Sequence, residues 1–386
     1  MSLRILHVVP AIAPRYGGPS AAAIGMCRSI NGLGHEALIA TTDADGADRL
    51  CVPIGQWTSH QDVSTMFFRR ALGESFKWSH GLAPWLDANV GHFDVVHVHA
   101  VFSHASIAAG RACRKRNVPY VVRPLGTLDP WSLRHHRVRK QALFALGARG
   151  LLRGASVMHY TSREEYLLVE SALPGLPPGV VVPNGVDEGF FTEAVDATAT
   201  SPYVVSLSRL DPKKRLDVLI RAFHIVVNEP DLGSWRLLIA GDGDPHYVSA
   251  LKEIAAAGPA AARIEFVGWQ GGPDKVRLVQ CARLFALPSS QENFGISVAE
   301  ALAAGVPVVV TPGVNLAPEI VEAGAGWVAA QDIDAFASAL QHAMRAGNRA
   351  DLQRCARGFA QSFRWSNVAN RLVTVYEDAV RSRQAA

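Results

Sequence analysis

The sequence has few charges and few cysteines for its length. Only 19% of its 386 residues are charged, and the five cysteines are scattered without a C-x-x-C pair. An odd number of scattered cysteines argues against a disulfide framework and fits reduced thiols in a cytoplasmic compartment. Because 49% of the residues are hydrophobic, the composition predicts a compact protein with a large core and excludes intrinsic disorder.

Long apolar runs and a strong charge excess are also missing. No stretch of about 18 apolar residues occurs, which argues against a membrane-spanning helix. The N-terminus, MSLRILHVVP, is too short for the apolar part of a signal peptide and is typical of a first strand. The net charge of +4 is too small to indicate a general nucleic-acid binder. The length predicts two or three domains.

The most informative stretch covers residues 284–310. Residues 284–287 form a short apolar strand, and a polar loop follows it. Residues 296–304 are rich in Ala and Leu and predict a helix that stops at Gly305, before a strand over 306–310. Such a strand–loop–helix–strand unit places its loop at the carboxyl end of a parallel sheet, where α/β proteins bind ligands.

Two carboxylates flank the start of this helix. Glu292 precedes the helix, and Glu300 lies just over one turn inside it. The first-turn amides of Phe294, Gly295 and Ile296 lack intrahelical partners and suit a phosphate. Glu300 is expected roughly 6 to 8 Å beyond them, about the step from a diphosphate to a ribose. One loop could thus hold a nucleotide-sugar, although E-x7-E alone fits an ordinary βαβ unit equally well.

Gly17 and Gly18 follow the first predicted strand, residues 3–9. They precede a helix expected over 21–33, for which Ser20 is a candidate N-cap. A glycine pair at this place either brings backbone amides against an anion or simply makes a tight turn.

The strand predicted over 94–99 places His97 and His99 on one face. Two imidazoles suggest a metal site, but no third ligand stands at a suitable spacing. The pattern D-x-D occurs three times, at 43–45, 242–244 and 332–334, and such repetition by chance gives it little weight. We therefore expect no catalytic metal.

Basic residues dominate the segment from Arg111 to Arg153, where Asp129 is the only acid. This segment is either a solvated helical face or an electropositive surface for an anionic membrane or a polyprenyl-phosphate acceptor. Trp131 within it can serve as an interfacial anchor.

The stretch 289–310 closely resembles the nucleotide-sugar signature of retaining GT-B glycosyltransferases of the glycogen-synthase-like group, glycosyltransferase family 4, also called glycosyl transferases group 1. The resemblance rests on E-x7-E, the Phe-Gly between the two acids, and the Ala-Gly-x-Pro-Val-Val exit. It covers nearly the whole chain and is strongest over 209–307.

The resemblance implies an α/β fold of GT-B architecture, with two Rossmann-like domains whose parallel sheets face each other across a cleft. The N-terminal, acceptor-side domain is expected over 1–195, joined by a C-terminal crossover helix over about 366–386. The nucleotide-sugar-binding domain is expected over 200–365, after a small, polar linker over 193–201.

Cations after the first strand of the second half match the family's G-R-L-x-x-x-K-G element. Arg209 and Lys214 keep its spacing, whereas Ser208 and Arg215 replace its two glycines. The resemblance implies that both cations neutralise the donor's diphosphate. It also implies that Gly268, at the end of a predicted strand, flanks the nucleobase.

The family's D-x-x-H-x-H pattern matches residues 94–99, which implies that His99 faces the cleft and His97 lies in its wall. Many members end the next strand with a histidine that touches the donor sugar, where this sequence has Arg123. Arg123 contacts either an anionic acceptor or a phosphate, or it is a structural ion-pair partner. The implied catalytic residues are His99, Arg123 and Glu292. The implied donor-binding residues are Gly17, Gly18, Arg209, Lys214, Gly268, Asn293, Phe294, Gly295, Ile296 and Glu300.

The function implied by the resemblance is retaining transfer of a sugar from a UDP- or GDP-sugar to a glycan or polyprenyl-linked acceptor, in polysaccharide or cell-surface glycan biosynthesis. Such an enzyme of the EC 2.4 class needs no metal and no cofactor, and we expect it in the cytoplasm with peripheral contact to the inner face of the membrane. The alternatives are a nucleotide-sugar epimerase of the same fold and a non-catalytic partner of glycan assembly. Retention of Arg209, Lys214, Glu292 and Glu300 argues against the latter.

Overall fold

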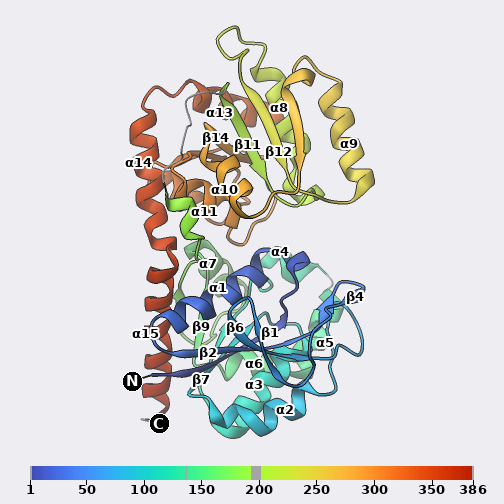
Figure 1. Ribbon diagram of the computed structural model, residues 1–386, viewed down its shortest axis with the longest axis vertical. Coiled ribbons are helices and arrows are strands. Elements are labelled where there is room, and N and C mark those ends of the chain that lie inside the picture. The colour runs from blue at the N-terminus through green and yellow to red at the C-terminus, as the bar shows by residue number, and fades with distance from the viewer. Residues whose placement is uncertain (1, 136, 193–200, 385–386) are drawn as a thin grey trace. The chain divides into compact units, whose positions relative to one another are not determined.

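A computed structural model describes residues 2–135, 137–192 and 201–384. The chain divides into unit 1, Met1–Gly185 with Trp365–Ala386, and unit 2, Val186–Arg364 (Figure 1). Each unit is α/β and has its own parallel-stranded sheet, as predicted. The division falls about ten residues before the end predicted for the first domain. Apart from Ser201, the predicted linker lies outside the described residues.

The sheet of unit 1 has the strand order β10-β9-β8-β7-β1-β2-β6-β5 and is parallel except for the β5–β6 pair. Chain order reverses between β1 and β7, which are neighbours. A small β3–β4 hairpin, Ala44–Asp45 and Asp48–Arg49, is separate. The strands of the sheet are β1 Arg4–Ala11, β2 Glu36–Thr42, β5 Trp57–His60, β6 Val63–Phe68, β7 Val95–His99, β8 Tyr120–Arg123, β9 Val157–Tyr160 and β10 Gly179–Val181.

Helices cover both faces of this sheet. Side chains of α1 and α15 pack with Ile5 and Val95 on one face. Those of α2, α3, α6 and α7 pack with Leu6 and Val96 on the other, as period-two alternation requires. The helices of unit 1 are α1 Gly18–Gly32, α2 Leu82–Asn89, α3 His104–Arg116, α4 Pro130–Arg134, α5 Arg137–Leu143, α6 Arg149–Arg153, α7 Arg163–Ala172 and α15 Trp365–Gln384, with the short turns η1 Pro14–Tyr16 and η2 Val90–His92 and the π-helix η3 Phe144–Ala148.

The sheet of unit 2 has the order β13-β12-β11-β14-β15-β16, and all its pairs are parallel. Side chains of α8, α9 and α13 cover one face, and those of α10, α11, α12 and α14 cover the other. Its strands are β11 Tyr203–Leu207, β12 Arg236–Ala240, β13 Ile264–Gly268, β14 Leu284–Leu287, β15 Val308–Val310 and β16 Gly326–Val328. Its helices are α8 Leu216–Val226, α9 Pro245–Ala256, α10 Gly272–Gln280, α11 Ile296–Ala303, α12 Ala317–Glu322, α13 Ile333–Arg345 and α14 Arg349–Ala360, with the short turns η4 Glu188–Phe191, η5 Pro212–Lys214, η6 Ala261–Arg263 and η7 Gln361–Phe363.

The start of α1 differs from the prediction. The helix begins at Gly18, its N-cap is Gly17, and Ser20 lies inside its first turn, so Ser20 as N-cap was wrong. Gly17 has φ +69°, a left-handed conformation that favours glycine, and Pro19 fits the first turn. Within the described residues, no helix combines the length and apolar character needed to cross a bilayer.

Trp365, the first residue of α15, fits a notch made by two glycines of unit 1. A Cβ atom built on Gly25 of α1 would lie 2.2 Å from the Trp365 ring, and one on Gly185 would lie 2.1 Å from it. The indole therefore fixes the entry of the chain into α15 against α1.

We expect Gly25→Ala to lower the free energy of unfolding by about 1–3 kcal/mol, because the added methyl overlaps the Trp365 ring. Gly32→Ala is the matched control: it lies in the same helix and its methyl would meet nothing within 4 Å. Urea unfolding followed by circular dichroism measures both. Equal midpoints for the two variants would contradict the notch.

Candidate functional site

The carboxyl ends of β11 and β14 meet in the middle of unit 2. These neighbouring strands mark the point where chain order reverses, the usual ligand position in open α/β sheets. Backbone contacts join the loops that follow them: the Lys213 carbonyl accepts from the Ser290 amide at 2.7 Å and from the Ser289 hydroxyl at 3.1 Å. The two sequence segments singled out for a donor therefore form one site.

The loop after β14 ends at the N-terminus of α11. Gly295 is the N-cap with φ +76°, and Ile296 is the first helical residue. Among the described residues, the amides of Phe294, Gly295 and Ile296 have no acceptor, as predicted. Phe294 itself is buried and packs edge-on against Phe363. This contact anchors the loop to the core of unit 2. The predicted strand, helix and glycine stop of this segment are confirmed.

Glu292 and Lys214 form an ion pair at this site. The Lys214 ammonium donates to Oε1 of Glu292, and the Ser289 hydroxyl donates to the same oxygen at 3.1 Å. Both charged side chains are mostly covered, at 14% and 15% exposed. An anion that binds between Lys214 and the free amides must compete with Glu292 for this ammonium.

Glu300 is buried one turn inside α11. Its Oε1 accepts from the ammonium of Lys275 at 2.5 Å, and its Oε2 has no partner. Burial raises the pKa of Glu300, while Lys275 opposes this shift. A buried carboxylate oxygen without a donor is available to a ligand hydroxyl. Lys275 was not predicted, because it stands 25 residues before Glu300 on a different helix.

Arg209 and Gly268 also belong to the predicted donor set. Arg209 is exposed after β11, and Gly268, with φ +71°, ends β13 two strands away. Gly241 and Gly243, after β12, were not predicted to matter. A Cβ at either would lie 1.8 to 2.0 Å from the carbonyl oxygens of Ser208 and Leu210, so only glycine lets these backbones approach.

The loop of Gly17 and Gly18 lies at the carboxyl end of β1 in unit 1. Neighbouring loops support it: the Tyr16 hydroxyl donates to Glu74 at 2.6 Å and accepts from the Gly46 amide at 2.9 Å. The amide of Gly17 closes the preceding turn by donating to the Pro14 carbonyl. The loop is a defined structure at the reversal point of the first sheet.

Two residues with side chains adopt left-handed backbone conformations at the ends of β7 and β8. Ala100 has φ +64° directly after His99, and Leu125 has φ +57° two residues after Arg123. Such conformations cost about 1 kcal/mol or more and gather at functional sites. The buried carboxylate of Glu165 holds the second loop by accepting from the Gly126 amide at 2.8 Å.

His99 and Arg123 are enclosed within unit 1. His99 is 1% exposed, no more open than His97, so the expected difference between the two is not found. Arg123 is fully buried; its guanidinium donates to Oδ1 of Asn184 and, at 3.5 Å, to Nδ1 of His99. In this structure both side chains support the strand ends from inside.

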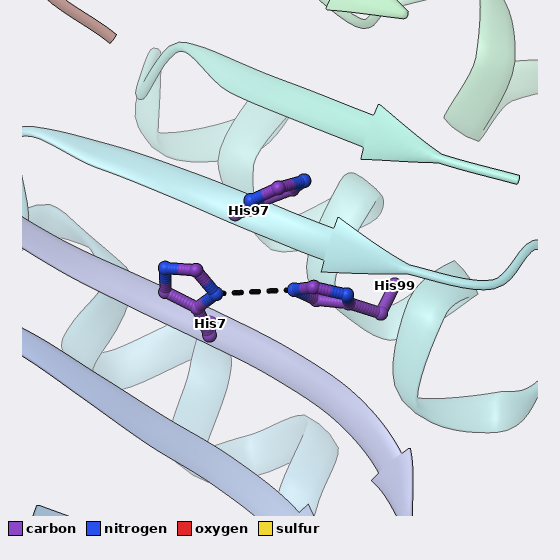
Figure 2. Close-up of side chains that lie close together, drawn as sticks. All are labelled: His7, His97 and His99. Atoms are coloured by element: carbon purple, nitrogen blue, oxygen red, sulfur yellow. Dashed lines mark hydrogen bonds between the residues drawn. The ribbon is translucent and has the colours of Figure 1, made fainter. Parts of the chain in front are cut away.

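A third imidazole, which the sequence spacing did not reveal, joins them. His7 of β1 is in register with His97 of β7, and ligand nitrogens of His7, His97 and His99 lie within 4.8 Å of one another (Figure 2). His159 of β9 lies on the same face, which α1 and α15 cover. The result is a buried cluster of four imidazoles.

The Val182 carbonyl, at one end of the hydrogen-bond network, determines the tautomers of His159 and His97. The carbonyl of Val182 can only accept, so His159 donates through Nε2 at 2.8 Å. Nδ1 of His159 then accepts from Nε2 of His97 at 3.2 Å. Nδ1 of His97 in turn accepts from the Tyr376 hydroxyl at 2.8 Å, which ties α15 to the sheet.

The guanidinium of Arg123, at the other end, determines the tautomers of His99 and His7, because it can only donate hydrogen bonds. Nδ1 of His99 accepts from Arg123, and Nε2 of His99 donates to Nδ1 of His7 at 3.1 Å (Figure 2). Nε2 of His7 keeps its hydrogen and is buried without a partner. In this arrangement every imidazole lone pair accepts a hydrogen bond, and the nearby guanidinium adds a positive charge.

Burial keeps these imidazoles neutral. It lowers the pKa of His7 and His159 to about 3, and Arg123 contributes to both shifts. It also holds the pKa values of His97 and His99 well below the usual range, with neighbouring imidazoles contributing. Burial lowers the pKa of Arg123 to about 10, so the guanidinium stays charged at neutral pH.

Comparisons with known proteins cover both units. The model described as "Glycosyltransferase Family 4" matches residues 16–190, and the model described as "Glycosyl transferases group 1" matches residues 201–346. The chain is 26% identical over 389 residues to GDP-mannose:cellobiosyl-diphosphopolyprenol alpha-mannosyltransferase of Xanthomonas oryzae pv. oryzae, covering 98% of this chain and 97% of that protein. It is 29% identical over 309 residues to D-inositol 3-phosphate glycosyltransferase of Actinosynnema mirum, covering 75% and 73%.

A solved structure shares the fold. HepE of Anabaena, crystallised with UDP and glucose, superimposes with a TM-score of 0.75 at 20% identity, covering 97% of this chain and 100% of that one.

The imidazole cluster predicts acid-sensitive stability for unit 1. The imidazoles of the unfolded chain bind protons near pH 6.5, whereas burial lowers the pKa of His7 and His159 to about 3 and holds the pKa values of His97 and His99 well below the usual range. Stability is therefore complete above about pH 6.5 and falls as the pH drops, by up to about 1.4 kcal/mol per pH unit for each imidazole that the fold keeps neutral.

Hydrogen exchange read by mass spectrometry, corrected for its intrinsic pH dependence, tests this. We expect β7 amides to lose protection between pH 6.5 and 5, and β11 amides of unit 2, whose strands contain no histidine, to keep it. Unchanged protection of β7 at pH 5 would refute the neutral cluster.

Proposed function

Because this chain belongs to the family 4 glycosyltransferases, the glycosyl transferases group 1, and has their GT-B fold, we propose that it moves a sugar from a nucleotide-sugar to a glycan or lipid-linked acceptor with retention of anomeric configuration. One observation carries the donor part of the proposal. Oε2 of Glu300 is buried and unpartnered, one turn inside a helix whose first amides are free, at the reversal point of the unit 2 sheet.

The donor fits this site in the order diphosphate, ribose and base. The amides of Phe294, Gly295 and Ile296, with Arg209 and Lys214, bind the diphosphate. Glu300 accepts from ribose hydroxyls, and Gly268 leaves the base open to backbone contacts. Asn293 lies in the same loop.

Donor binding also rearranges one ion pair. When a phosphate takes the Lys214 ammonium, Glu292 is released to accept from hydroxyls of the transferred sugar. The donor phosphate therefore replaces Glu292 as the anionic partner of Lys214.

The reaction proposed needs neither a protein nucleophile nor a metal. The acceptor oxygen bonds to the anomeric carbon on the face from which the phosphate oxygen departs, and a phosphate oxygen of the donor takes the acceptor proton. Cations and helix amides stabilise the leaving diphosphate by electrostatic preorganisation. Gly17 and Gly18 approach the donor phosphates and the acceptor through their amides, while His99 and Arg123 orient the reacting centre by supporting the strand ends.

The acceptor proposed is a polyprenyl-linked glycan at the inner face of the membrane. The Xanthomonas relative is named for a diphosphopolyprenol acceptor. On unit 1, α4, α5 and η3 expose Trp131, Val138 and Leu146, at 41%, 80% and 74%. Exposed cations accompany them: Arg134, Arg137, Arg139 and Arg149. Apolar side chains among cations suit an anionic bilayer surface.

A thermal-shift screen with UDP, GDP, ADP and their sugars tests the donor site. One nucleotide at 100 times its dissociation constant should stabilise the protein by about 2.7 kcal/mol. We expect Glu300→Ala and Arg209→Ala to abolish the shift. Arg345→Ala, which breaks a surface ion pair on α13, should keep it. If no nucleotide shifts the wild type, the proposal fails; turnover without an acceptor would favour an epimerase.

Flotation with phosphatidylglycerol vesicles tests the membrane surface. Arg137→Glu with Arg139→Glu should weaken binding roughly thirtyfold or more, since each cation contributes about 1 kcal/mol. Leu146→Asp should also weaken it. Val321→Asp changes a residue of unit 2 that is 55% exposed and should leave binding unchanged. Equal binding of all variants would place the contact elsewhere.

A further inference from the structure

Lys275 lies between solvent and the buried carboxylate of Glu300. It belongs to the first turn of α10, and its Nζ is 2.5 Å from Oε1 of Glu300. Its side chain is 24% exposed, against 7% for that of Glu300. The ring of Phe190 lies 5.4 Å from the same ammonium and covers it on another side. Lys275 therefore reaches from the surface to a carboxylate that solvent hardly touches.

Few other charges act on this carboxylate. Asp187, which precedes η4, opposes its ionisation. Glu188 of η4 pairs with Arg364. The strands β14 and β15 and the turn η7, which also pack against α11, have no ionisable side chain. From α14, Arg357 lies at Gly305, beyond the other end of the helix. Among the described residues, Lys275 is thus the cation that contacts Glu300.

We propose that Lys275 is a positioning residue for the donor: it keeps Glu300 ionised and occupies Oε1, so that Oε2 accepts from a ribose hydroxyl of a nucleoside-diphosphate sugar. The inference rests on the proposed function and adds to it the residue on which the ribose contact depends.

The protonation state of Glu300 determines how strongly it accepts a hydrogen bond from the ribose. A carboxylate accepts charge-assisted hydrogen bonds, which are stronger than those accepted by a neutral acid. Burial and Asp187 both favour the neutral form of Glu300, and Lys275 opposes them. Without the ammonium, the pKa of Glu300 rises further, and at mildly acidic pH the site presents a neutral acid to the ribose.

The test measures nucleotide affinity by isothermal titration calorimetry, with UDP-glucose and GDP-mannose as probes, at pH 6.0, 7.0 and 8.5. For the probe that binds the wild type, we expect Lys275→Met to weaken binding by about tenfold or more at pH 6.0, the worth of one charge-assisted hydrogen bond. The loss should shrink as the pH rises and Glu300 ionises again. Lys275→Arg should bind nearly as the wild type does.

Two controls separate this role from loss of packing. Lys115→Met removes a lysine–carboxylate pair from unit 1 and should leave affinity unchanged at every pH. In a Glu300→Gln background no charge is left to maintain, so Lys275→Met should cause no further loss. Thermal unfolding of each variant identifies any that fail to fold, and Lys275→Arg then carries the comparison.

The outcomes are distinct. If the wild type binds and Lys275→Met binds equally well, or loses affinity by the same factor at all three pH values, Lys275 does not maintain the charge of Glu300. Tighter binding by Lys275→Met would mean that the lysine competes with the ribose for Oε1, which also overturns the inference. If neither probe nor UDP, GDP or ADP binds the wild type, the proposed function fails and the inference with it.

Discussion

The contact between the loops that follow β11 and β14 determines the geometry of the proposed donor site. Lys213 accepts through its carbonyl from Ser289 and Ser290, and this contact brings Lys214 to Glu292. The loop after β15 also approaches this strand end closely, because a Cβ on Gly313 would lie 2.4 Å from the Ser289 carbonyl. The cations and the free amides are therefore placed by main-chain packing, and long side chains need only span the remaining gap. In the proposed reaction, such preorganisation limits the reorganisation required.

The two units bury ionisable groups in different ways. Unit 2 encloses Glu300 and compensates it with Lys275, which lies between this carboxylate and solvent. Unit 1 encloses Arg123, satisfies it with an amide oxygen and an imidazole, and surrounds it with histidines that burial keeps neutral. The first solution leaves a carboxylate oxygen for a ligand. In unit 1, the imidazole lone pairs accept hydrogen bonds from neighbouring side chains. One of these bonds, from Tyr376 to His97, connects α15 to the sheet.

Local features of the sequence predicted the elements well. Apolar β-branched runs predicted the central strands, and the alanine-rich stretch with its terminal glycine predicted α11. These predictions succeeded because each depends on a few adjacent residues. The donor-side residues Arg209, Lys214, Glu292 and Glu300 also stand where the strand ends meet, since parallel strands share a carboxyl edge.

Long-range features were not predictable in the same way. His7 joins the cluster through the β1–β7 register, which pairs residues 90 positions apart, and no local spacing reveals it. The burial of Arg123 depends on Asn184, 61 residues later. Arginine is rarely enclosed, and the burial of Arg123 was not predicted. Ser20 failed as a cap because the left-handed turn at Gly17 starts the helix earlier.

Unit 1 combines segments that are synthesised first and last. One face of its sheet is covered by α1, near the start of the chain, and by α15, at its end, so its core includes both Ile5 and Leu372. Ribosomes add roughly 5–20 residues per second, and about 190 residues separate Gly185 from Tyr376, a delay of about 10–40 s. Throughout that time the nascent unit lacks α15, which leaves part of this apolar face uncovered and His97 without the Tyr376 hydroxyl, while the continuous unit 2 is completed first. A newly made chain is therefore most exposed to chaperones and proteases in its earliest-made half.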